Sequence, residues 1–239
     1  MTNDLTRVKN EVNGLKEKLA TPMKRGTFLK YAGATAAVTG LILAGCKDDD
    51  DNGPNVVDLG SGDTGILNYA YLLEQLEAAF YVKVVASPFS GMTAAETTIL
   101  TEIRDHELIH RDFFKAAITS NRISDNVDFD FGSIDFTSRT KVLATAMAFE
   151  DLGVSAYNGA GKLILNADYL LLAGKIVSVE ARHASAIRDL INPNTAYFSG
   201  DDVVTTDKGL DGAKTPAEVL GTAGVYVKAT VKFDNLPTT

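Results

Sequence analysis

The sequence predicts an all-α protein, a four-helix bundle with one long crossover connection. Four segments have the length and apolar periodicity of long helices, and Pro, Gly and Asn residues separate them. The connections after the first and third segments are short, whereas the connection over residues 121–136 is long. Because short connections join antiparallel neighbours in a bundle, the long one is expected to return along the bundle's length.

The composition of the 239-residue chain is that of a globular protein, with 45% hydrophobic and 23% charged residues. Its formal net charge of -8 weighs against a nucleic-acid partner, which usually meets a basic surface. The chain has one cysteine, which excludes an intrachain disulfide framework and a CxxC zinc or redox site.

The first two helices have clear boundaries in the sequence. The first is predicted over residues 66–86, because Pro88 disfavours helical backbone at the residue before it. Thr93 and Glu96 have the spacing of a capping box, which predicts the start of a second helix that runs to about residue 120.

The last two helices are bounded by Asn, Gly and Pro. The third is predicted over residues 137–157, where the sequence Asn-Gly-Ala-Gly at 158–161 is expected to break it. The fourth is predicted over residues 168–191 and ends at the Asn-Pro pair 192–193.

The domain organisation follows from these elements. An acidic tether is expected at 47–64, the bundle at 65–195 and a tail rich in Thr, Asp and Gly at 196–239. The tail is predicted to be irregular, with one strand-like run at 225–233.

The N-terminal region predicts export. Residues 23–46 start with basic side chains, continue with an uncharged run at 31–44 and end at Cys46. The run is shorter than the roughly 20 apolar residues of a transmembrane helix and has the proportions of a signal-peptide core. Its end, Leu-Ala-Gly-Cys, resembles a bacterial lipobox, which implies lipidation of Cys46; the alternative is a buried free cysteine at the end of a core helix.

The lipobox resemblance implies a lipid-anchored protein of the cell envelope, with the outer membrane as its partner. The acidic run 48–51 is either a solvated linker or, by resemblance, a surface-export signal of outer-membrane lipoproteins. Residues 25–30 resemble a twin-arginine motif with Gly26 in place of the second arginine, so the export route stays open. Residues 1–22 have amphipathic spacing and are either a removed extension or precede a true start at Met23.

Charged residues recur in alternate helices. The second and fourth helices each contain a Glu-x-x-His pair, Glu107 with His110 and Glu180 with His183. At a spacing of three residues, both side chains of a pair project from one helix face.

The first and third helices share the pattern Glu-x-Leu-x-x-small-x-Tyr, which aligns Glu74 with Glu150 and Tyr81 with Tyr157. The chain therefore resembles two copies of a helix pair, each with one Glu and one Glu-x-x-His. The repeat selects Glu74 over Glu77, because a glycine stands at the position that matches Glu77.

Four glutamates and two histidines suit two transition-metal ions, iron or manganese. Two divalent ions cancel four carboxylate charges, which lowers the free-energy cost of burying these side chains. Glutamates can bridge two ions, and each histidine binds one; Tyr81 and Tyr157 are expected to donate hydrogen bonds to the ligating carboxylates. The predicted ligands are Glu74, Glu107, His110, Glu150, Glu180 and His183.

Two nearby residues have open roles. His106, beside Glu107, is expected to support a ligand or to face solvent rather than bind metal. Glu77 is either a spare ligand or an exposed partner of Lys83.

These motifs resemble those of the ferritin-like superfamily, in which two helices each supply a Glu and two supply Glu-x-x-His. Residues 73–81, 103–107 and 179–184 resemble the secreted ferritin-like group related to plant desiccation-related proteins, and the likeness covers residues 64–195. The plant relatives often lack the last histidine, whereas His183 is present here, which favours metal binding.

The resemblance implies a dinuclear centre, with iron the first choice, that oxidises metal with oxygen or a peroxide as the small oxidant. Three interpretations stay open: a metal-dependent oxidase or peroxidase, a metal-binding or storage protein without turnover, and a stress-related structural or interaction module with a vestigial site. The sequence leaves the substrate and the oligomeric state open.

Overall fold

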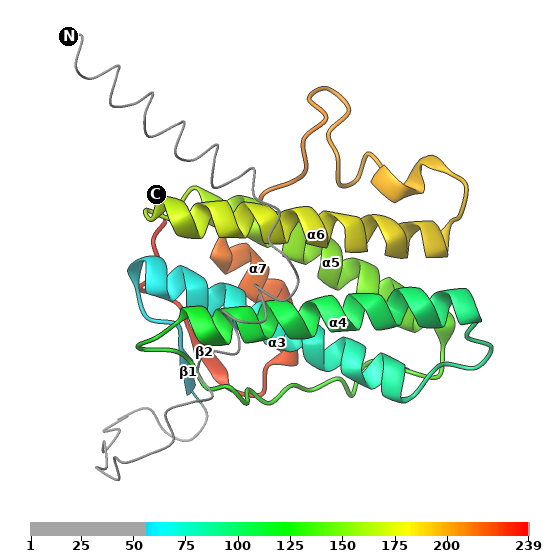
Figure 1. Ribbon diagram of the computed structural model, residues 1–239, viewed down its shortest axis with the longest axis horizontal. Coiled ribbons are helices and arrows are strands. Elements are labelled where there is room, and N and C mark those ends of the chain that lie inside the picture. Colours follow the sequence, from blue (N-terminus) through cyan, green and yellow to red (C-terminus); the bar gives the residue numbers. More distant parts are fainter. Residues whose placement is uncertain (1–55, 239) are drawn as a thin grey trace. The chain divides into compact units, whose positions relative to one another are not determined.

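A computed structural model describes residues 56–238. The predicted signal segment 23–46 with its Cys46, the extension 1–22 and the acidic run 48–51 lie outside the described residues. Four long helices form the bundle (Figure 1), which confirms the predicted all-α fold. They are α3 (Gly62–Ala86), α4 (Ala94–Ala117), α5 (Arg139–Gly161) and α6 (Ala167–Ile191).

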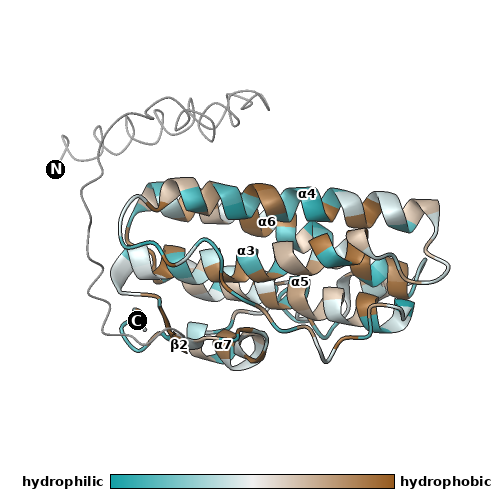
Figure 2. Ribbon diagram, turned by 90° about the horizontal axis from the view of Figure 1, so that it is seen from below, coloured by the Kyte–Doolittle hydropathy of each residue, from teal (hydrophilic) through white to brown (hydrophobic). Residues whose placement is uncertain are grey.

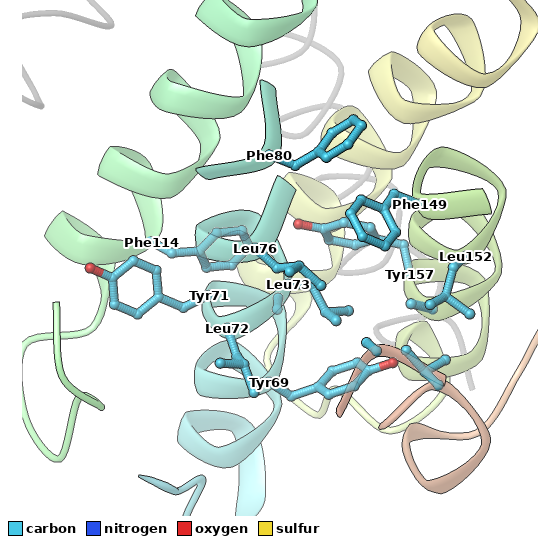
Figure 3. Close-up of a cluster of buried hydrophobic side chains, with 14 of the residues drawn as sticks. Tyr69, Tyr71, Leu72, Leu73, Leu76, Phe80, Phe114, Phe149, Leu152 and Tyr157 are labelled. Carbon is cyan, nitrogen blue, oxygen red and sulfur yellow. The ribbon is translucent and has the colours of Figure 1, made fainter. Parts of the chain in front are cut away.

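The four helices pack as two hairpins, α3 with α4 and α5 with α6. The helix α3 is buried along most of its length, whereas α4 is amphipathic and presents many hydrophilic residues at the surface (Figure 2). Figure 3 shows the aromatic centre of the core, where the rings of Phe80 and Phe149 meet edge to face at 5.1 Å between centroids. This contact joins α3 of one hairpin to α5 of the other.

The crossover between α4 and α5 follows α3 from its first turns towards its last (Figure 1). Asn68 donates from Nδ2 to the carbonyl oxygen of Asn121 at 2.7 Å, and Gln75 donates from Nε2 to that of Ser124 at 3.1 Å. Further along, the Lys83 amine lies 4.3 Å from the centre of the Phe136 ring. Successive crossover residues thus meet successive turns of α3, and the connection returns along the bundle as the helix pairing required.

The sequence Asn-Gly-Ala-Gly does not break the third helix, which continues to Gly161. The C-terminal tail packs against this end of the third helix instead. A Cβ atom on Gly159 would lie 1.7 Å from the carbonyl oxygen of Lys214, so only glycine permits this approach. Asn158 donates from Nδ2 to the carbonyl oxygen of Gly212 at 3.1 Å, and the Lys214 amide donates to that of Ser155 at 2.9 Å.

The tail contains more regular structure than the sequence suggested. Helix α7 (Pro216–Ala223) packs on α5 and was not predicted, although Thr215 and Glu218 form a capping box and proline occupies the first helical position. Short 3₁₀ helices occupy Ala196–Ser199 and Gly224–Tyr226. The predicted strand is shorter than the run 225–233: β2 covers Thr230–Lys232.

The expected tether differs from the structure over its last residues. Strand β1 (Val56–Asp58) pairs in parallel with β2, with Val57 opposite Val231. Leu59 is buried, and its carbonyl oxygen accepts a hydrogen bond from Asn68 Nδ2 at 3.1 Å. Residues 56–61 are therefore part of the folded domain, and α3 begins at Gly62. None of the helices between residues 56 and 238 combines the length and apolar character that crossing a membrane requires.

Candidate metal centre

The four helices bring the six predicted ligands together in the bundle interior. Helices α3 and α5 supply one glutamate each, and α4 and α6 supply the two Glu-x-x-His pairs. The glutamates are fully buried, and His110 and His183 are 8% and 4% exposed. We refer to this set as the carboxylate–histidine cluster: Glu74, Glu107, His110, Glu150, Glu180 and His183.

The cluster consists of two overlapping groups of four, each with ligand atoms within 4.8 Å of one another. The first metal position comprises Glu74, Glu107, His110 and Glu180. The second metal position comprises Glu107, Glu150, Glu180 and His183. Glu107 and Glu180 belong to both positions, as bridging carboxylates would, whereas each histidine belongs to one.

The distances follow the same division. At the first position, His110 Nδ1 lies 2.9 Å from Glu180 Oε1 and 3.4 Å from Glu74 Oε2. At the second, His183 Nδ1 lies 2.8 Å from Glu107 Oε1 and 3.3 Å from Glu150 Oε2. Both imidazoles therefore direct Nδ1 into the cluster.

The two tyrosines cross between the half-repeats. Tyr81 of α3 donates to Glu150 Oε1 of α5 at 2.5 Å, and Tyr157 of α5 donates to Glu74 Oε1 of α3. Burial and the adjacent carboxylate raise the pKa of each phenol well above its usual range, so both hydroxyls keep the proton they donate. Each tyrosine fixes one carboxylate oxygen and leaves the other to face the cluster.

One family model, described as a ferritin-like domain, matches residues 62–193. The chain belongs to this ferritin-like family. The matched segment contains the four long helices and the whole cluster. No curated protein matches the chain.

The hydrogen bonding of the carboxylate–histidine cluster is compatible with bound metal ions. Among residues 56–238, every buried side-chain nitrogen or oxygen without a hydrogen-bond partner belongs to the cluster, except the Tyr69 hydroxyl. They include both oxygens of Glu107 and Glu180 and the Nδ1 atoms of both histidines. Buried polar groups normally have partners, so this concentration indicates atoms held for a ligand. Carboxylate oxygens and imidazole nitrogens are suitable donors for iron or manganese.

In the metal-free cluster some groups retain protons, whereas Glu107 is ionised. Burial raises the pKa of Glu74 to about 7 against the opposing effect of His110. Burial disfavours the charged form of Glu107, but its interactions with His110 and His183 outweigh this and lower its pKa to about 2. Burial likewise disfavours the imidazolium of His183, yet Glu150 and Glu107 raise its pKa to about 11. Ions that bind here must displace protons, as metals do at such sites.

The structure shows where Glu77 and His106 lie, the two residues for which the sequence left alternative roles. Glu77 is 4% exposed beside the cluster, so it is not an exposed partner of Lys83. Burial and Glu180 raise the pKa of Glu77 well above its usual range. His106 Nδ1 lies 2.9 Å from His183 Nε2, the ring nitrogen that faces away from the cluster. The burial of Glu77 was not evident from sequence; its one signal was the glycine at the repeat-related position 153.

Proposed function

We propose that this chain is an exported ferritin-like protein that binds two ions, iron or manganese, and supports metal oxidation by oxygen or a peroxide. The observation that carries the proposal is the set of buried donor atoms in two groups that share Glu107 and Glu180, most of which form no hydrogen bond and have only ion-pair contacts within the cluster. A cluster kept for structure alone would be expected to satisfy its own polar groups.

The chain's residues provide three conditions for such chemistry. The shared glutamates would hold two ions, and four carboxylates match the charge of two divalent ions. Tyr81 and Tyr157 orient the terminal carboxylates. The buried surroundings limit access of water. Bound iron or manganese would supply the electron transfer to the oxidant.

The first experiment measures metal content per chain, then oxygen or peroxide consumption with iron(II) or manganese(II). Two ions per chain with catalytic consumption of oxidant are expected. Two ions without turnover would replace the oxidase proposal by binding or storage. No uptake of either metal would mean a vestigial site and favour a stress-related structural or interaction module, in line with the resemblance to desiccation-related proteins.

We also propose that the mature protein is lipid-anchored at Cys46 in the outer membrane, and the acidic run 48–51 favours the cell surface. The support is the lipobox-like end of the uncharged run. Cys46→Ser is expected to abolish labelling by a fatty-acid analogue and to remove the protein from the membrane fraction. Undiminished labelling and membrane retention of the variant would contradict the anchor.

A further inference from the structure

The internal repeat allows the surroundings of the two cluster tyrosines to be compared. Tyr81 and Tyr157 occupy equivalent positions, and each donates a hydrogen bond to the repeat glutamate of the other half. The residues next to them are not equivalent in size. The position before the tyrosine is Phe80 in α3 and Ala156 in α5, so a ring in one half corresponds to a methyl group in the other.

Aromatic rings pack the core beside Tyr81. The Phe80 ring meets the rings of Tyr81 and Phe149 edge to face, each at 5.1 Å between centroids. Figure 3 shows Phe80 of α3 and Phe149 of α5 side by side in the core. From the crossover, Phe131 and Phe136 bring their ring centroids to 6.1 and 5.8 Å from that of Phe80.

A cavity lies beside Tyr157 instead. In the repeat, Ala156 and Leu73 stand at the positions that match the ring pair, and both residues line the cavity. Its volume is about 30 Å³, and all four long helices contribute to its wall. Phe114 of α4 also lines it, with its ring centroid 6.5 Å from that of Tyr157. The space is thus found where smaller side chains replace the aromatic pair.

The wall of the cavity is apolar. Apart from its three tyrosines, every lining residue is alanine, leucine, isoleucine or phenylalanine, and almost no polar surface faces the space. The Tyr157 hydroxyl is already bonded to Glu74, and the Tyr69 hydroxyl is the one buried hydroxyl of the wall without a partner among residues 56–238. A buried water typically makes roughly two to four hydrogen bonds, so water is not favoured here.

The size of the cavity restricts its occupant to a very small molecule. The volume of about 30 Å³ exceeds the roughly 10–15 Å³ that one water requires, and is well below the roughly 150 Å³ of a cavity that holds benzene. Dioxygen has the matching size and no polar hydrogen. Hydrogen peroxide carries two O–H donors, which would lose their hydrogen bonds to water without replacement.

The cavity connects the protein surface with the cluster. Part of its wall is half-buried, including Phe113 of α4 and Ala173 of α6, whereas Ala156 is only 1% exposed. At the buried side stands Tyr157, whose hydroxyl donates to Glu74 of the first metal position. A molecule in the cavity therefore lies against the side chain that contacts the cluster.

We propose that this cavity binds dioxygen, and that Ala156 and the other small residues of its wall favour dioxygen over hydrogen peroxide as the oxidant that reaches the cluster. Binding of the gas depends on the cavity alone. Its part in turnover rests on the proposed function.

The first test is nuclear magnetic resonance of the metal-free full chain under dioxygen pressure. Dioxygen is paramagnetic, so it accelerates the relaxation of methyl protons close to it. The methyl groups of Ile66 and Ile176, which line the cavity, should relax several-fold faster than those of Ile103 and Ile187, which are also buried but lie elsewhere in the core.

Two substitutions of alanine on α5 provide the comparison. Ala156→Val should abolish the difference, because the added methyl groups occupy the space, whereas Ala144→Val makes the same change at an exposed position and should preserve it. If Ala156→Val fails to fold, Ala173→Leu at the half-buried rim replaces it. Equal relaxation of lining and other buried isoleucines in the wild type, water contacts at the cavity methyl groups, or an undiminished difference in the filled variant would overturn the proposal.

Turnover of the metal-loaded protein tests the choice of oxidant. Ala156→Val should raise the KM for dioxygen roughly tenfold, with kcat, metal content and the rate with hydrogen peroxide unchanged. Equal slowing with both oxidants would contradict the preference for dioxygen. A wild type that consumes neither oxidant would overturn the proposed oxidase function, whereas the relaxation measurement on metal-free protein would still decide whether the cavity binds dioxygen.

Discussion

Two groups of buried charges share helices α5 and α6, and they are satisfied in opposite ways. Arg188, 1% exposed, donates to both carboxylate oxygens of Asp151, to both of Asp202 and to the Tyr197 carbonyl oxygen. All the N–H groups of its guanidinium thus have acceptors. The carboxylate–histidine cluster, to which the preceding residue Glu150 belongs, leaves most of its donor atoms without hydrogen bonds.

The difference separates a structural network from a cluster that is compatible with bound metal ions. The Arg188 network ties the tail to the α5–α6 hairpin and needs nothing from outside the protein. The cluster holds carboxylates close together in a buried setting, in two groups that could each hold a metal ion. Removal of metal and removal of a structural partner should therefore have separable effects.

The largest effect is expected from Glu107→Gln, which removes a carboxylate shared by both positions. The wild type should gain about 4 kcal/mol of unfolding free energy at a metal concentration roughly 1,000-fold above the dissociation constant, because only the folded state binds. The variant should lose both ions and this gain. Metal analysis and melting curves with and without manganese(II) measure it; full metal stabilisation of the variant would show that Glu107 is not a shared ligand.

Arg188→Met should destabilise the protein by about 3 kcal/mol, because it leaves the partly buried Asp151 without its cation. The loss should be equal in metal-free and metal-loaded protein, and metal content should not change. Arg182→Met on the same helix is the control: Arg182 is exposed and, within residues 56–238, hydrogen-bonds only to Ser178, so a change below about 0.5 kcal/mol is expected. A loss of metal in Arg188→Met would connect the two networks and contradict their separation.

Tyr81→Phe and Tyr157→Phe test the hydrogen-bonded edge of the cluster. Each removes the donor to one buried carboxylate oxygen, at a cost of about 1–3 kcal/mol in the free energy of unfolding. The crossed geometry predicts similar losses for the two variants. Chemical denaturation of both metal-free proteins measures them, and a loss in one variant alone would show that the half-repeats are not equivalent at the tyrosines.

The parts predictable from sequence were those set by repetition along helices. The Glu-x-x-His spacing and the aligned Glu74 and Glu150 identify residues on common faces, so their convergence follows once the four helices pair. Long-range contacts were not predictable in this way. The glycine at 159 looked like a helix stop, because its packing partner Lys214 is far away in sequence. The burial of Glu77 similarly depends on space left by a glycine of another helix.

The smallest effect is expected from the Asp202 ion pair, whose dependence on pH differs in sign from that of the cluster. Arg188 lowers the pKa of Asp202, so this pair stabilises the protein above the usual aspartate pKa of about 3.8 and the contribution is lost as the pH falls through the lower folded value. Burial raises the pKa of Glu74 to about 7, so its effect has the opposite sign: stability is present below the usual value of 4.5 and falls as the pH rises towards 7.

Asp202→Asn separates these windows, because it removes a carboxylate that is 58% exposed and should cost less than about 1 kcal/mol. The metal-free variant should lose the acid dependence below about pH 4 that the Asp202 pair contributes, while the decline of stability between about pH 5 and 7 persists. Manganese(II) should reverse that decline, since ions compete with protons for the cluster and bind more tightly as the pH rises. Melting temperatures across pH, with and without metal, measure both windows. If Asp202→Asn also flattened the decline near neutral pH, the two networks would titrate together, and the distinction between a self-satisfied ion pair and a site kept for cations would fail.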